Sequence, residues 1–111
     1  NSRELVERIV SVHGLENHFS CIMTGCDVAK GKPAPDIYLA VAVELGVEPE
    51  RCLVFEDIIP GILAGKAAGM KVCAVEDLYS ISQKEEKAAA ADYYIADFIQ
   101  MPDDCKRKLI L

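Results

Sequence analysis

Short apolar runs alternate along the chain with segments whose apolar residues recur at helical spacing. Continuous apolar runs bounded by glycine or acidic residues predict strands that are covered on both faces. The longer segments between them predict helices, which Gly14, Gly46 and Gly69 terminate. The expected strands are residues 21–24, 52–55, 71–75 and 93–96. The first expected helix begins after Ser2, and the others cover residues 35–45, 60–68 and 80–91, with a final helix or tail at 103–111.

This alternation of helix and strand predicts an α/β fold with a Rossmann-like parallel sheet and helices on both faces. Three glycines, Gly61, Gly65 and Gly69, recur every four residues on one expected helix. Because glycine lets a helix approach its neighbours closely, this spacing favours a helix that packs tightly against the sheet.

Composition and charge exclude several classes of protein. The 111 residues are 51% hydrophobic, which is too apolar for a disordered chain. The formal net charge of −6 argues against a nucleic-acid binder, and no apolar run is long enough to cross a membrane. The number of cysteines is odd and none form a CxxC pair, so we expect buried, reduced thiols and a cytoplasmic location. These are Cys21, Cys26, Cys52, Cys73 and Cys105.

Charged residues stand where the expected parallel strands end, which is where such sheets bind ligands. Lys32 lies in a proline-stiffened loop after the first expected strand, and Glu56 and Asp57 follow the second. At 4 Å and an effective dielectric of 20, two like charges repel by about 4 kcal/mol. Mg²⁺ would offset that repulsion, because it binds one or two carboxylates together with phosphate oxygens and water. Taken singly, these residues also fit an exposed loop lysine, a solvated glutamate and a helix cap.

In combination, these motifs identify a family. The segment GKPAPDIY at residues 31–38, VFED at 54–57, PGI at 60–62 and AAGM at 67–70 resemble the haloacid dehalogenase (HAD) superfamily. The resemblance is closest to its sugar-phosphate phosphatase and β-phosphoglucomutase-like branch, and it covers essentially the whole chain.

The resemblance implies a Mg²⁺-dependent phosphohydrolase that acts on a small phosphorylated metabolite through an aspartyl-phosphate. It implies that Lys32 is the family's catalytic lysine, which also binds phosphate, and that Asp57 and Glu56 are its metal ligands. Ser2 lies near the expected phosphate-binding hydroxyl, but its position favours a role at the start of the first helix.

Some expected parts of the family's machinery do not occur in these residues. The family's nucleophile and acid/base lie in an Asp-x-Asp segment, and this chain contains none. We therefore expect residues 1–111 to be the C-terminal portion of one HAD-like core domain, without the first two core strands and the cap. The piece alone is expected to be inactive and not a stable monomer, because its sheet edges would be exposed. The missing N-terminal part or another chain would complete the sheet.

Ile58 also departs from the family pattern, because the family often has a small or hydroxyl residue at this position.

Two alternatives remain open from the sequence. A phosphomutase of the same family shares these residues and differs in the cap. A non-catalytic Rossmann-like module would keep the lysine and the acids for phosphate sensing or structure only. A receiver-like domain also uses acids, a lysine and Mg²⁺, but its acidic pair comes near the start of the fold, unlike this one.

Overall fold

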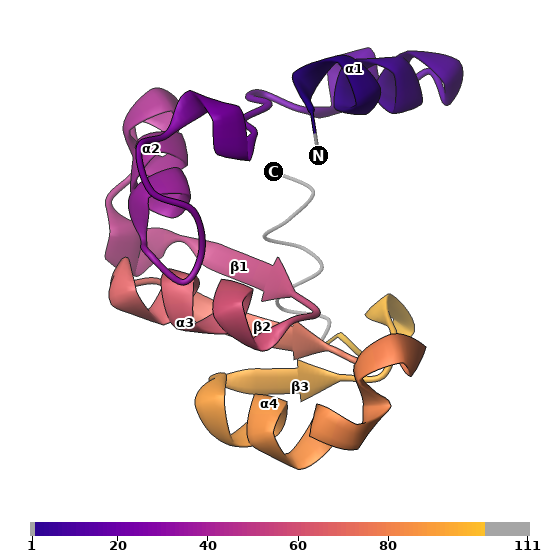
Figure 1. Ribbon diagram of the computed structural model, residues 1–111, viewed down its shortest axis with the longest axis vertical. Coiled ribbons are helices and arrows are strands. Elements are labelled where there is room, and N and C mark those ends of the chain that lie inside the picture. Colours follow the sequence, from indigo (N-terminus) through magenta and orange to yellow (C-terminus); the bar gives the residue numbers. More distant parts are fainter. Residues whose placement is uncertain (1, 102–111) are drawn as a thin grey trace.

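The described part of the chain forms a sheet of three parallel strands. The computed structural model describes residues 2–101, and it orders the strands β1 (Leu53–Glu56), β2 (Lys71–Val75) and β3 (Tyr93–Ile95) (Figure 1). All three run in the same direction, so their carboxyl ends share one edge of the sheet. This confirms the α/β class and three of the expected strands.

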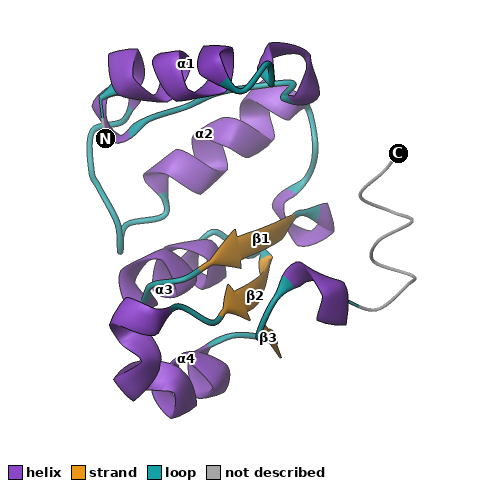
Figure 2. Cartoon of the chain, turned by 90° about the vertical axis from the view of Figure 1, so that its right-hand side faces the viewer, coloured by secondary structure: helices purple, strands orange, loops and turns teal. Residues whose placement is uncertain are grey.

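Alternation along β1 assigns its side chains to two different layers. Val54 and Glu56 are buried toward α3 (Ile59–Ala67), which contacts both β1 and α4 (Lys84–Ala90) on the same face of the sheet (Figure 2). Phe55 points to the opposite face, where the centre of its ring lies 5.3 Å from the centre of the Phe98 ring. The apolar core therefore forms mainly between the sheet and α3. It consists of Ala42, Val54, Ile62, Ala68, Met70, Val72 and Ala74.

The glycines of α3 serve different purposes. A Cβ atom at Gly65 would lie 2.7 Å from Cγ2 of Val72, so close packing against the sheet is confirmed at this position. Gly69 instead has a φ of +80° just after the helix, and the nearest atom to a Cβ there is 3.9 Å away. The expectation of close packing was wrong for Gly69, which ends the helix in a left-handed conformation.

The segment at residues 21–24 was expected to be a strand, and this prediction was wrong. Its backbone is extended at Thr24, but it belongs to no sheet in the described part of the chain. An apolar run becomes a strand only when a neighbouring strand accepts its hydrogen bonds. The described sheet contains only β1, β2 and β3, and none of these strands pairs with residues 21–24. The segment is held partly by Arg3, which donates to the carbonyl of Ile22 at 3.3 Å.

The helix expected over residues 80–91 is broken into two. A 3-10 helix, Leu78–Gln83, precedes α4, and Ser80 within it has a non-helical φ of −119° and ψ of 22°. The hydroxyl of Ser80 bonds to groups outside the helix, which stabilises the break. Polar side chains of this kind compete with regular helical hydrogen bonding.

The remaining helices agree with the sequence. α1 (Arg3–Val12) lies at the end of the molecule away from the sheet (Figure 1), and α2 (Asp36–Leu45) ends at Gly46 with a φ of 66°. The expected helix at residues 103–111 and Cys105 lie outside the described residues. None of the described helices combines the length and apolarity needed to cross a membrane. Of the other cysteines, Cys73 is buried, Cys21 and Cys52 are half-buried, and Cys26 is exposed, so the expectation of burial was wrong for Cys26.

Candidate active site

Glu56 is the centre of a polar cluster at the carboxyl end of β1. Its side chain is only 8% exposed, and its Oε1 atom accepts hydrogen bonds from Nζ of Lys32 and from the hydroxyl of Tyr38. The ammonium group therefore offsets a buried negative charge, which would otherwise be strongly unfavourable. The lysine and the acid predicted from the sequence thus meet directly.

The loop before α2 holds Lys32 in place. A hydrogen bond of 3.0 Å from the amide of Ala34 to the carbonyl of Gly31 closes a turn around it, and the Lys32–Pro33 peptide is cis. Nζ of Lys32 lies 5.3 Å from the centre of the Tyr38 ring, within the range of a cation–π interaction. Because the lysine side chain is still 34% exposed, a bound anion can reach it.

Tyr38 is a member of the cluster that the sequence reasoning missed. Burial raises the pKa of its hydroxyl far above the usual value, and the hydrogen bond to Glu56 raises it further. The hydroxyl therefore stays protonated and remains a donor to the carboxylate. Tyr38 lies in the first turn of α2, directly after the lysine loop, and this position was the only indication in the sequence that it could join the cluster.

Gly61 makes room for the Glu56 carboxylate. A Cβ atom at this position would overlap the side-chain carboxyl group of Glu56. The helix can therefore approach the strand end only because residue 61 has no side chain.

Replacing Gly61 with alanine should consequently displace the Glu56 carboxylate from Lys32 and Tyr38. We expect the free energy of unfolding of the full-length protein to fall by about 1–3 kcal/mol, the usual effect of overpacking. Urea unfolding measures this loss. Gly31→Ala is the control, because nothing lies within 4 Å of a Cβ atom there. Equal stability of the two variants would contradict the close contact.

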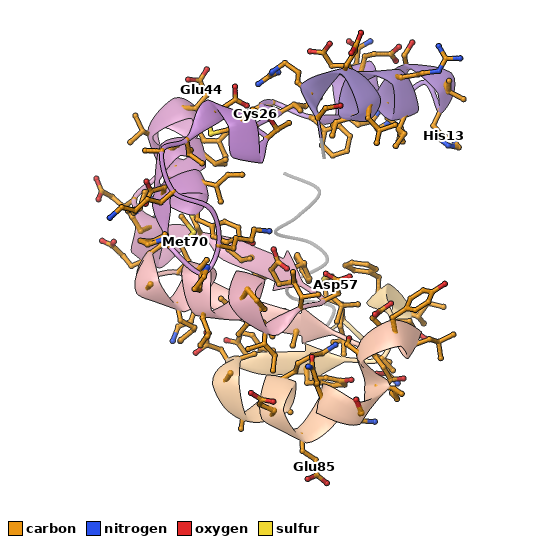
Figure 3. The ribbon with its side chains drawn as sticks, viewed as in Figure 1. His13, Cys26, Glu44, Asp57, Met70 and Glu85 are labelled. Carbon is orange, nitrogen blue, oxygen red and sulfur yellow. The ribbon has the colours of Figure 1, made fainter. Side chains whose placement is uncertain are left out.

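Asp57 occupies the turn just beyond β1 (Figure 3). Its side chain is exposed, whereas its backbone carbonyl accepts hydrogen bonds from Lys87 at 2.8 Å and Ser80 at 3.3 Å. The negative charge of Asp57 also contributes to raising the pKa of Tyr38, so this charge acts within the cluster. Asp57 therefore has a backbone carbonyl held by two donors and an exposed side chain.

A family model described as "Hydrolase: haloacid dehalogenase-like hydrolase" matches residues 1–69, which is more than half of the chain. The chain belongs to this family. The match includes Lys32, Glu56 and Asp57, and the structure brings the first two of these residues into contact.

Three relatives illustrate what this haloacid dehalogenase-like chain is similar to. It is 49% identical over 70% of its length to the bifunctional riboflavin kinase/FMN phosphatase of Arabidopsis thaliana, and covers 21% of that protein. It is 42% identical over 76% of its length to a probable pseudouridine-5'-phosphatase of Drosophila melanogaster, covering 37% of it. A HAD family hydrolase from Deinococcus radiodurans, solved with bound phosphate and sodium, superposes with a TM-score of 0.83 at 26% identity. That superposition covers 98% of this chain and 50% of the other, so the chain spans half or less of each relative.

The haloacid dehalogenase-like cluster offers oxygen atoms suited to a hard cation. Both donors to Glu56 converge on Oε1, and no described residue donates to Oε2. Asp57, the next residue in the chain, has an exposed side chain. Within residues 2–101, however, no three His, Cys, Asp or Glu side chains are arranged to hold a metal ion. Two carboxylates fit Mg²⁺, which takes its remaining ligands from substrate phosphate and water.

Ser2 does not join this cluster. Its hydroxyl accepts a hydrogen bond of 3.3 Å from the amide of Leu5, which confirms its role as the N-cap of α1. Among the described residues, no hydrogen bond links it to Lys32 or the acids. Lys32 also lines an open pocket of about 340 Å³, whose other walls include the apolar side chains of Val6, Met23 and Ile37; neither Glu56 nor Asp57 lines it.

Proposed function

We propose that the protein containing this chain is a Mg²⁺-dependent phosphohydrolase that acts on a small phosphorylated metabolite. The contact between Lys32 and Glu56 at the strand end carries this proposal, since it fixes a cation against the first of two successive acidic residues. Membership of the haloacid dehalogenase-like hydrolase family agrees with this chemistry.

In this proposal one group of residues binds the phosphate and another binds the metal ion. Lys32 binds the phosphoryl oxygens, and its position is set in advance by Glu56 and Tyr38, as electrostatic catalysis requires. Asp57 and Glu56 would hold Mg²⁺. When bound, the ion neutralises negative charge on the phosphoryl group.

The nucleophile of the reaction would come from outside these residues. An aspartate carboxylate attacks phosphorus, the bond to the substrate oxygen breaks, and the released alkoxide takes up a proton. Water then hydrolyses the aspartyl-phosphate and regenerates the carboxylate. We propose that residues 1–111 form the C-terminal portion of the core domain, and that the rest of the protein or another chain supplies this aspartate.

The relatives support a small phosphate monoester as the substrate. Two of them are named as phosphatases of FMN and of pseudouridine 5'-phosphate, which differ in the group attached to the phosphate. The feature that these substrates share is a phosphate monoester, and the residues of the cluster are suited to bind that group.

The proposal is tested with the full-length protein and a panel of phosphate monoesters. In the presence of Mg²⁺ we expect release of inorganic phosphate from at least one sugar phosphate or nucleotide. Excess EDTA should stop this release, and adding back Mg²⁺ should restore it. A phosphate assay measures all three conditions.

Three results would contradict the proposal. Phosphate release that is unaffected by EDTA would exclude Mg²⁺ as the cofactor. A protein that binds phosphate monoesters without hydrolysing them would instead support a non-catalytic phosphate-sensing module, and conversion of one sugar phosphate into its isomer would support a phosphomutase.

A further inference from the structure

Lys87 is a completely buried lysine that the proposed reaction leaves without a role. It lies on α4, its relative exposure is 0%, and its ammonium group makes three hydrogen bonds. The acceptors are the carbonyl of Asp57 at 2.8 Å, the carbonyl of Val75 at 3.1 Å and Oγ of Ser80 at 3.1 Å. None of these acceptors is a carboxylate, and in the described residues no acid forms an ion pair with Lys87.

Lys87 forms no direct ion pair among the described residues, although its charge adds to the Lys84 hydrogen bond in lowering the pKa of Glu76. A buried charge of this kind is retained only when its hydrogen bonds compensate for lost hydration. Here all three protons of the ammonium group have acceptors, which accounts for its burial. A methionine would fill the same space without the free-energy cost of burying a charge. The placement of the charge therefore calls for an explanation beyond packing.

The acceptors of Lys87 link the carboxyl ends of two neighbouring strands. Asp57 follows β1 directly, and Val75 is the last residue of β2. Ser80 comes from the 3-10 helix that follows, and its hydroxyl also lies 3.3 Å from the Asp57 carbonyl and 3.2 Å from Oδ2 of Asp77. Since a hydroxyl has one proton, Lys87 is the permanent donor to Asp57, and Ser80 shares its proton between two acceptors.

We propose that Lys87 is a positioning residue for the metal-binding turn, because it fixes the Asp57 carbonyl and thereby the direction of the Asp57 carboxylate. This inference rests on the proposed function. The two successive acidic residues are thus held by two different lysines. Lys32 binds the side chain of Glu56, and Lys87 binds the backbone of Asp57.

Holding the backbone leaves the carboxylate of Asp57 available. If the side chain of Asp57 itself were paired with a lysine, a cation would have to displace that lysine. A donor to the carbonyl restricts the turn without occupying the metal-binding oxygens. Groups that orient metal ligands in this way typically contribute about 10–100-fold to metal affinity.

The test measures Mg²⁺ binding to the full-length protein by calorimetry, together with its thermal stability. Lys87→Met keeps the volume but removes all three hydrogen bonds, and we expect the Kd for Mg²⁺ to rise about tenfold. Lys84→Met is the matched control, because Lys84 lies on the same helix, is exposed and pairs with Glu76. Its Kd for Mg²⁺ should equal that of the wild type.

A Lys87→Met protein that loses thermal stability but binds Mg²⁺ like the wild type would overturn the inference, because the role of Lys87 would then be structural only. Should Lys87→Met fail to fold, Lys87→Gln decides, because its shorter, uncharged side chain cannot make all three hydrogen bonds. A rise in its Kd of about threefold or more supports the positioning role, and an unchanged Kd overturns it. A wild-type protein that binds no Mg²⁺ would refute the proposed function as well, whereas normal binding by the wild type and by Lys87→Met refutes only this inference.

Discussion

Replacing Lys32 with alanine in the full-length protein is expected to lower kcat for phosphate release by about 10²–10³-fold. The reason is that the ammonium group is held beside the acidic pair before substrate arrives. Glu56 and Tyr38 contact it, while the lysine side chain remains 34% exposed. A flexible lysine would have to be ordered during the reaction, so its removal would matter less. Steady-state phosphate release at saturating Mg²⁺ measures the effect.

The same substitution should also destabilise the protein, by about 1–3 kcal/mol. Removing Lys32 leaves the carboxylate of Glu56, which is 8% exposed, with Tyr38 as its remaining donor. Lys32→Ala therefore changes activity and stability together, and a second variant has to separate them.

The double variant Lys32→Ala/Glu56→Gln makes that separation. The neutral amide no longer needs a counter-charge, so we expect the free energy of unfolding to recover toward that of the wild type while kcat stays low. Lys30→Ala is the control, because Lys30 is an exposed lysine of the same loop. If Lys32→Ala releases phosphate at the wild-type rate, Lys32 has no place in the reaction.

The general position of the site could be predicted from the sequence, but the ion pair between Lys32 and Glu56 could not. Parallel strands bring their carboxyl ends to one edge, so Lys32, Glu56 and Asp57 were expected to lie near one another. The repulsion between the two acids was interpreted as a sign of a metal. In the structure Lys32, 24 residues away, offsets part of that repulsion through Glu56. A counter-ion so distant in sequence leaves no local pattern.

The strand predicted at residues 21–24 illustrates a second limit. Apolar runs favour an extended backbone, and Thr24 is extended. Whether such a run becomes a strand depends on a hydrogen-bonding neighbour that its own residues do not encode. Lys87 shows a similar limit. The sequence predicts a helix over residues 80–91, but it does not indicate that this lysine is buried. Only the ends of β1 and β2 explain its burial.

The carboxylate of Asp57 offers the sharpest test of the metal site. Asp57→Asn keeps the shape of the side chain and leaves the backbone carbonyl bound to Lys87, so only the negative charge is lost. We expect the concentration of Mg²⁺ required for half-maximal activity to rise about 100-fold, the upper end of the range for groups that support a metal.

Stability distinguishes this variant from damage to the fold. Because the Asp57 side chain is exposed, the melting temperature of Asp57→Asn should stay close to that of the wild type. Glu85→Gln is the charge-matched control, since Glu85 is an exposed acid on the far side of α4 from the turn (Figure 3). Its metal dependence should not change. If Asp57→Asn has the same metal dependence as Glu85→Gln, Asp57 is not a ligand.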